Sequence, residues 1–141
     1  MTFDIIGPEA EAKLDWLALT DALAAGHALA RADVADTVLR HGPDTLLTRS
    51  AWIAGMGIAV KAATIFPGNP ARGLDAIDGA VNLLSAEDGR LEAMIDFKLV
   101  TKWKTAGDSL LAARRLARPD AGRILIVGAG AVSRSMVGAY R

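Results

Sequence analysis

The chain has 141 residues, of which 52% are hydrophobic, and its 16 basic and 16 acidic residues balance. This apolar content excludes a disordered chain and is enough for a folded core. A balanced charge provides no field that favours nucleic acid or an anionic membrane surface. We therefore expect neither a nucleic-acid partner nor a membrane partner.

Several residue types that build metal and redox sites are missing or scarce. There is no cysteine, and the histidines are His27 and His41. Disulfides, thiolate zinc sites, cysteine nucleophiles and histidine-rich metal clusters are therefore excluded. The N-terminus lacks the basic and apolar segments of a secretory signal, and the longest apolar run, residues 51–60, is too short to span a bilayer. We expect a soluble, cytoplasmic protein without a metal site.

The first third of the chain predicts a strand followed by helices. Residues 3–6 are typical of a short strand, and residues 9–14 of a short helix. Apolar residues at helical spacing predict a longer helix over residues 16–29, with Asp15 as its N-cap. Residues 31–43 are polar and predict irregular structure.

The middle of the chain predicts a group of strands. They are expected at residues 45–48, 57–66, 76–85 and 91–96. The last two strands are joined by a glycine-containing turn, which indicates an antiparallel hairpin. Prolines and glycines in residues 67–73 predict an ordered loop. These segments favour an α+β domain with an antiparallel or mixed sheet.

A second amphipathic helix is expected after the strands, over residues 99–117, where Leu99, Trp103 and Leu110 fall on one stripe. The three tryptophans of the chain, Trp16, Trp52 and Trp103, are most simply interpreted as core residues.

The C-terminal segment contains a strand–glycine–helix pattern. Residues 123–127 predict a buried strand, and a G-x-G-x-x-S turn and an amphipathic helix follow. In dinucleotide folds such a turn brings backbone amides to a pyrophosphate, which makes Gly128, Gly130, Ala131 and Val132 candidate cofactor-binding residues. The acidic residue that should bind the ribose, about 20 residues after the glycines, would fall beyond residue 141. We interpret the chain as the N-terminal part of a longer protein.

Three segments carry a resemblance to a known family. Residues 61–74 resemble its VKxVTVFPxNPxxGL motif, and residues 101–109 resemble its TxxRTAAxS helix start. Residues 117–131 resemble its LARPDA…GAGA entry to a nucleotide domain. The order and spacing agree from roughly Asp44 to the C-terminus with the ornithine cyclodeaminase/mu-crystallin family.

The resemblance implies a two-domain, dimeric protein that depends on NAD or NADP. Residues 1–121 would form the substrate-binding and dimerisation region, and residues 122–141 would begin a Rossmann-type domain with its first β-α unit. The implied partners are a small amino-acid or imino-acid substrate and a second copy of the chain. Residues 1–141 alone are expected neither to bind the cofactor nor to be active.

Two lysines match family positions that contact substrate. The resemblance gives Lys61 a place at the substrate, and it gives Lys104 the place of an arginine that binds the substrate carboxylate. Arg49 falls where the family often has methionine, and the family's catalytic aspartate lies beyond the chain end. From the residues alone, the alternative for Lys61 is an edge lysine that reaches solvent, and the alternative for Lys104 is a pair with Asp108 on a helix surface.

Other carboxylates offer a weaker hypothesis. Asp75, Asp78 and Asp96 could act as paired acids, but their spacing does not bring them together.

The resemblance implies an NAD-dependent ornithine cyclodeaminase. The alternatives are a cyclic-imine reductase or an alanine dehydrogenase of the same family, or a non-catalytic module that dimerises or binds a ligand.

Overall fold

The computed structural model describes residues 2–141, which form two compact units. The first unit contains the residues up to Ala10 together with Ala30–Val100, and the second contains Glu11–Leu29 and Thr101–Arg141. The boundary expected after residue 121 is a different division of the chain, because it separates a substrate-binding region from a cofactor-binding region. That boundary stays a prediction.

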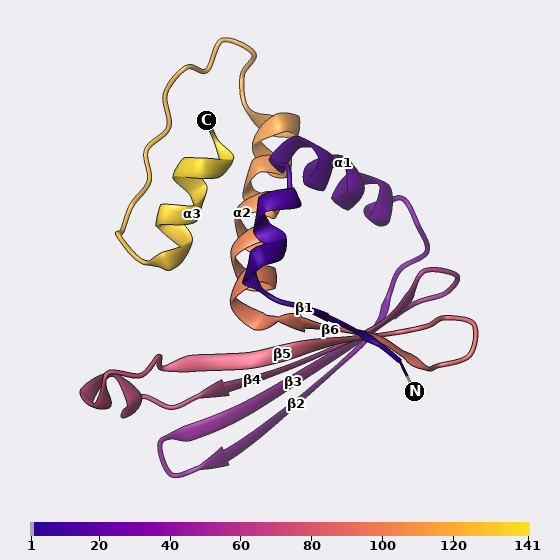
Figure 1. The fold of residues 1–141 in the computed structure, drawn as a ribbon. Coiled ribbons are helices and arrows are strands. Elements are labelled where there is room, and N and C mark those ends of the chain that lie inside the picture. Colours follow the sequence, from indigo (N-terminus) through magenta and orange to yellow (C-terminus); the bar gives the residue numbers. More distant parts are fainter. Residues whose placement is uncertain (1) are drawn as a thin grey trace. The chain divides into compact units, whose positions relative to one another are not determined.

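The first unit is built on one mixed sheet of six strands in the order β1-β6-β5-β4-β3-β2 (Figure 1). Neighbouring strands from β2 to β6 are antiparallel, whereas β1 runs parallel to β6. This arrangement confirms the predicted α+β class for this part of the chain. The strands are β1 (Asp4–Ile6), β2 (Asp33–His41), β3 (Asp44–Ile53), β4 (Gly57–Ile65), β5 (Ile77–Leu84) and β6 (Leu91–Asp96).

Strand β2 corrects the prediction of irregular structure over residues 31–43. It pairs with β3 along its whole length, from Asp33 opposite Trp52 to His41 opposite Asp44. All nine of its residues are exposed, because it lies at the edge of the sheet. An edge strand needs no continuous apolar face. The polar sequence of β2 therefore did not predict a strand.

The sheet has an apolar interior that is centred on β4, β5 and β6. Ala63, Val81 and Ala93, one from each of these strands, are buried. Gly79 of β5 lies where a Cβ atom would collide with the carbonyl oxygen of Ala62, so only glycine permits this close approach of β4 and β5. Gly89 has φ of 71° and makes the predicted hairpin turn between β5 and β6. The predicted loop after β4 contains a short 3₁₀-helix, η2 (Asn69–Arg72).

The second unit is helical. It contains α1 (Trp16–His27), most of α2 (Phe97–Leu116) and α3 (Ala131–Ala139), and a 3₁₀-helix, η1 (Pro8–Lys13), precedes α1. Asp15 is the predicted N-cap of α1, and its side chain accepts a hydrogen bond from the Ala18 amide at 2.8 Å. No helix among residues 2–141 is long and apolar enough to cross a membrane.

Aromatic stacking and a small apolar cluster hold the helices of the second unit together. The Trp16 and Trp103 rings stack with centroids 3.8 Å apart. Ala106, Leu110 and Ala139 form the buried cluster beside them. These contacts confirm that Trp16 and Trp103 belong to a core.

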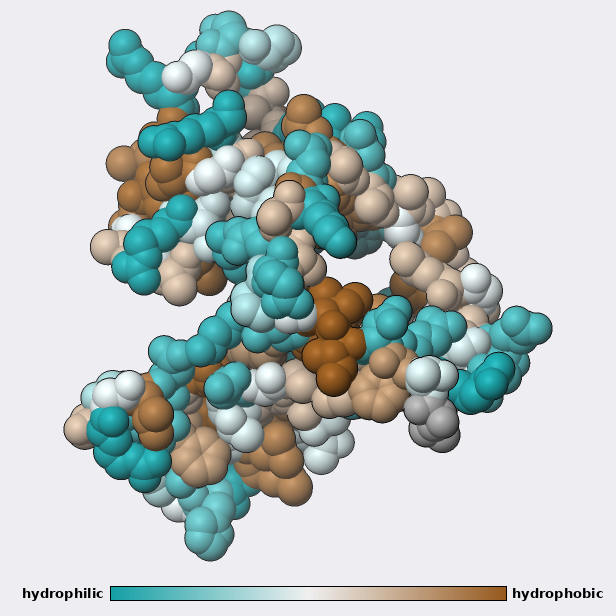
Figure 2. Space-filling view, viewed as in Figure 1, coloured by the Kyte–Doolittle hydropathy of each residue, from teal (hydrophilic) through white to brown (hydrophobic). Residues whose placement is uncertain are grey.

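Trp52 departs from the prediction that all three tryptophans lie in a core. It is 52% exposed on β3, and Leu39 and Leu46, which share its face of the sheet, are 60% and 37% exposed. Figure 2 shows such apolar side chains at the surface over the strands, in the lower half of the view. A large apolar residue in a strand is buried only if another layer covers its face, and no sequence pattern reports that layer.

The expected strand at residues 123–127 is absent from the structure, which corrects that part of the predicted β-α unit. Leu125 and Val127 are each 86% exposed, and no strand among residues 2–141 pairs with this segment. A parallel strand exists only when neighbouring strands satisfy its backbone groups. The helix expected after the glycine turn is present as α3.

Candidate functional site

Lys61 lies in the middle of β4 in the first unit. Its side chain is half-buried, and its ammonium lies over the ring of Phe97, 5.7 Å from the ring centroid. Among the residues that the structure describes, no carboxylate forms an ion pair with it. A half-buried ammonium with an aromatic ring and no counter-ion is suited to receive an anion from a ligand.

A row of charged residues crosses the sheet at Lys61. In the strand register Asp36 of β2 stands opposite Arg49 of β3, and Arg49 stands opposite Lys61 of β4. Residues that are directly opposite project from the same face, so these three side chains share one face of the sheet. The row continues with Val81 of β5 and Ile95 of β6, which are apolar.

Asp36 and Arg49 form a two-pronged ion pair. Arg49 Nε donates to Asp36 Oδ1 at 2.7 Å, and Arg49 Nη2 donates to Asp36 Oδ2 at 2.5 Å. These hydrogen bonds hold the pKa of the Asp36 carboxyl below its ordinary value, and the charge of Lys61 contributes less. They also raise the pKa of the Arg49 guanidinium. Asp36 therefore neutralises the positive charge of Arg49. The positive charge of Lys61 is left without a neutralising partner in this row.

Lys104 lies in the second unit, on an exposed position of α2. Its ammonium forms an ion pair with Asp108, one helical turn further along. The side chain of Lys104 is 64% exposed. The structure thus contains the surface pair that the sequence offered as the alternative to a substrate contact, and the substrate role of Lys104 stays a prediction.

The glycine turn before α3 presents free backbone amides. Gly128 adopts φ of 106°, and Gly130 is the N-cap of α3, with no side chain to bond the first amides of the helix. Ala131 and Val132 form its first turn. An uncapped helix N-terminus of this kind fits the pyrophosphate of a dinucleotide. These four residues therefore suit the role that the sequence predicted for them, and their binding of a cofactor stays a prediction.

The acidic residues Asp75, Asp78 and Asp96 have a common neighbour that sequence reasoning missed. Lys98 forms an ion pair with Asp75, and this hydrogen bond, with the charges of Asp78 and Asp96, raises the pKa of Lys98. The Asp96 side chain also accepts a hydrogen bond from the Leu99 amide at 2.6 Å in the first turn of α2. The Lys98–Asp75 pair joins the first turn of α2 to the loop before β5.

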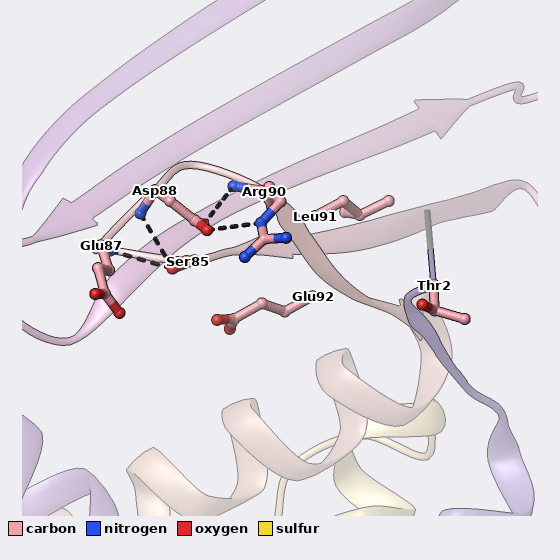
Figure 3. Close-up of a pocket in the computed structure, with 7 residues that line it drawn as sticks. All are labelled: Thr2, Ser85, Glu87, Asp88, Arg90, Leu91 and Glu92. Carbon is pink, nitrogen blue, oxygen red and sulfur yellow. Dashed lines mark hydrogen bonds and ion pairs between the residues drawn. The ribbon is translucent and has the colours of Figure 1, made fainter.

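An open hollow lies beside the β5–β6 hairpin (Figure 3). The side chains of its turn bond to the turn itself: Ser85 Oγ accepts from the Glu87 amide at 3.1 Å, and Asp88 accepts from the Arg90 side chain at 2.6 Å. Hydrogen bonds from the Arg90 backbone and side chain lower the pKa of Asp88. The polar side chains of the turn therefore stabilise the hairpin itself. The lining residues are Thr2, Ser85, Glu87, Asp88, Arg90, Leu91 and Glu92.

Residues 2–141 contain no group of three histidine, cysteine or acidic side chains placed to hold a metal ion. His27 and His41 are both exposed.

The sequence pattern of the ornithine cyclodeaminase/mu-crystallin family matches residues 36–141. A curated relative, the Δ1-pyrroline-2-carboxylate reductase of Paracoccus denitrificans, is 47% identical over 132 residues, which are 94% of this chain and 42% of that protein. The chain thus spans less than half the length of this relative.

Solved structures share the fold. An archaeal alanine dehydrogenase dimer with bound NAD superposes with a TM-score of 0.86 at 24% identity, over 99% of this chain and 45% of that chain. A lysine cyclodeaminase, described for its recognition of L-lysine, L-ornithine and L-2,4-diaminobutyric acid, gives a TM-score of 0.74 at 26% identity over the same shares.

Proposed function

The chain belongs to the ornithine cyclodeaminase/mu-crystallin family, and from this premise we propose that the intact protein reduces the C=N bond of a small cyclic imino acid. The observation that carries the proposal is the 47% identity to a Δ1-pyrroline-2-carboxylate reductase over nearly the whole chain. In this reaction a hydride adds to the ring carbon that bears the carboxylate, and a proton adds to the ring nitrogen. The product is the corresponding cyclic amino acid.

The substrate class has a carboxylate, and Lys61 is the residue we assign to it. Its unpaired, half-buried ammonium can form a charge-assisted hydrogen bond to a carboxylate oxygen. The apolar Phe97 and Val81 beside it suit the carbon ring of such a substrate. We also propose Lys104 as a carboxylate contact; as a lysine it supplies a point charge and no planar fork.

The reduced form of the nicotinamide cofactor, NADH or NADPH, would supply the hydride when bound. Gly128, Gly130, Ala131 and Val132 are the residues of this chain that would hold its pyrophosphate, through the free amides at the start of α3. Residues 122–141 would then begin the cofactor domain, with the exposed segment 123–127 becoming a strand once neighbouring strands are available to it.

Cyclodeamination of a diamino acid such as ornithine is the second candidate. The 26% identity to a lysine cyclodeaminase favours it, and both reactions require a carboxylate contact and a nicotinamide cofactor. The two candidates differ in the distal end of the substrate, which is an ammonium group in a diamino acid and part of a ring in a cyclic imine.

We propose a homodimer as the working form. The exposed apolar side chains of Leu39, Leu46 and Trp52 share one face of the sheet, and no strand within residues 2–141 pairs with the outer edge of β2. Apolar faces and free strand edges of this kind are commonly covered by a second copy.

The test is a pair of assays on the intact protein that contains this chain. Loss of NADH or NADPH absorbance with Δ1-pyrroline-2-carboxylate, without release of ammonia from ornithine, supports the reductase. Ammonia release from ornithine without imine reduction would overturn the reductase proposal and support the cyclodeaminase. Inactivity in both assays would favour a non-catalytic module. Lys61→Met should reduce the activity, whereas Lys13→Met, which removes an exposed lysine in η1, should leave it unchanged.

A further inference from the structure

The charge row Asp36–Arg49–Lys61 places two cations side by side on one face of the sheet. Arg49 is fixed by two hydrogen bonds to Asp36, and Lys61 stands opposite it on the next strand. Directly opposite residues have Cβ atoms about 4.5–5.5 Å apart, so a ligand that reaches Lys61 also lies within the field of Arg49. The row carries one net positive charge, since Asp36 offsets one of its two cations.

The residues around Lys61 on this face differ in size and exposure. The residues two positions away on β4 are Ala59 and Ala63, and Gly79 stands opposite Ala63 on β5. Ala63 and Val81 are buried, whereas the side chain of Arg49 is 57% exposed, so a ligand would reach the half-buried Lys61 from the side of β3. On one side of Lys61 the row is apolar, through Val81, and on the other side it is charged, through Arg49.

We propose that Arg49, held in place by Asp36, is a specificity-determining residue that disfavours substrates with a distal ammonium group relative to substrates whose distal end is uncharged. The inference rests on the proposed function, because it assumes that Lys61 receives the substrate carboxylate. A ligand anchored on Lys61 with its distal end toward β3 would lie beside Arg49. Because the substrate carboxylate offsets the charge of Lys61, the repulsion of a distal ammonium comes from Arg49, which stands nearer to Lys61 than its partner Asp36 does; a ring atom meets no such repulsion.

Asp36 has two effects in this arrangement. It orients the guanidinium of Arg49 through both hydrogen bonds, and its negative charge limits the repulsion that Arg49 exerts. Removal of Arg49 and removal of Asp36 should therefore shift the discrimination between the two kinds of substrate in opposite directions. Arg49→Met removes the cation and leaves the carboxylate of Asp36 to attract an ammonium, and Asp36→Asn leaves the cation of Arg49 uncompensated.

The experiment uses the intact protein and two probes with the same α-carboxylate, L-proline and L-ornithine. The measurement is the ratio of the ornithine dissociation constant to the proline dissociation constant in the presence of NAD. We expect Arg49→Met to lower this ratio roughly tenfold, as loss of one nearby cation in a partly solvated site implies. We expect Asp36→Asn to raise the ratio, and Arg49→Lys, which keeps the charge, to leave it within about twofold of the wild type.

The outcomes separate this inference from the proposed function. If Lys61→Met weakens both probes while Arg49→Met leaves their ratio unchanged, the substrate contact stands and the role of Arg49 is overturned. If Lys61→Met weakens neither probe, or neither probe binds the wild type, the proposed contact fails and the inference fails with it. A ratio that falls in Arg49→Met but also in Arg49→Lys overturns the charge argument. Circular dichroism of each variant, compared with the wild type, shows whether the sheet is intact.

Discussion

Lys104 forms an ion pair with Asp108, four residues further along α2. The pair is exposed to solvent, so it contributes little to stability, and pairs of this spacing are typically worth about 0.3–0.5 kcal/mol. The ammonium is therefore available to exchange its partner for a ligand carboxylate. This geometry allows both interpretations of Lys104, and a substitution can separate them.

Lys104→Met in the intact protein should weaken the binding of the carboxylate substrate. The loss of a charge-assisted hydrogen bond is worth roughly 1.5–3 kcal/mol, which is about ten- to hundred-fold in affinity. NAD binding should hardly change, because the proposed cofactor residues Gly128 and Gly130 belong to a separate segment. Two calorimetric titrations, one with substrate and one with cofactor, provide the measurement.

Asp108→Asn is the matched control for Lys104. It breaks the same ion pair but keeps the cation, so it should leave substrate affinity unchanged or slightly improved. Unchanged substrate affinity in Lys104→Met would show that the lysine belongs only to the surface pair.

A second prediction concerns assembly through the exposed apolar face. The double variant Leu39→Lys/Trp52→Lys should shift the proposed homodimer to monomer, because it places two charges on a face that a second copy would cover. Val34→Lys is the control: Val34 is also exposed on β2 but lies on the opposite face, together with Asp36. Sedimentation velocity at micromolar concentration measures the result. A monomeric wild type, or a double variant that remains dimeric, would contradict the prediction.

The sequence predicted the elements that depend on local pattern. The strands at β4, β5 and β6, the helices α1 and α2 and the N-cap Asp15 follow from periodicity and capping, which act within a few residues. It did not predict β2, an exposed edge strand that forms because it pairs with β3. It overpredicted the strand at residues 123–127, because an apolar run indicates the capacity for pairing and not the presence of a partner.

The candidate site was predictable only in part for the same reason. Lys61 was visible as a lone lysine in an apolar strand. Arg49 and Asp36 are 13 residues apart, and only the register of β2 and β3 brings them together beside Lys61. The cluster around Lys98 likewise depends on Asp75, which is 23 residues away. Charge pairs between distant segments leave no local signal in a single sequence.

A third prediction concerns the N-cap of α1. Asp15→Ala should reduce the free energy of unfolding by about 1 kcal/mol, because the Ala18 amide loses its hydrogen-bond acceptor. Asp15→Asn should retain most of the stability, since its side-chain oxygen can accept the same bond. Urea denaturation followed by circular dichroism measures the difference, and equal midpoints for the alanine variant and the wild type would count against the cap.

The last prediction uses the ion pair between Glu11 and Lys102 in the second unit. The hydrogen bond from the Lys102 ammonium holds the pKa of the Glu11 carboxyl below its ordinary value. A group whose pKa is lower in the folded state than in the unfolded state stabilises the fold above its unfolded pKa, which is about 4.3 for glutamate. That contribution is lost as the pH falls through the folded pKa. The wild type should therefore exceed Glu11→Gln in urea midpoint at pH 7, and the difference should shrink as the pH falls below about 4.3.

Lys102→Met supplies the matched control for Glu11, because it removes the other half of the same pair. Its midpoint should likewise approach that of the wild type in acid. Both side chains are partly exposed, at 41% for Glu11 and 39% for Lys102, so the difference at pH 7 should be modest and should decrease in high salt. A difference that persists unchanged from pH 7 to below the folded pKa would mean that Glu11 stabilises the unit through packing. The hydrogen bond to Lys102 would then not be the source of its effect.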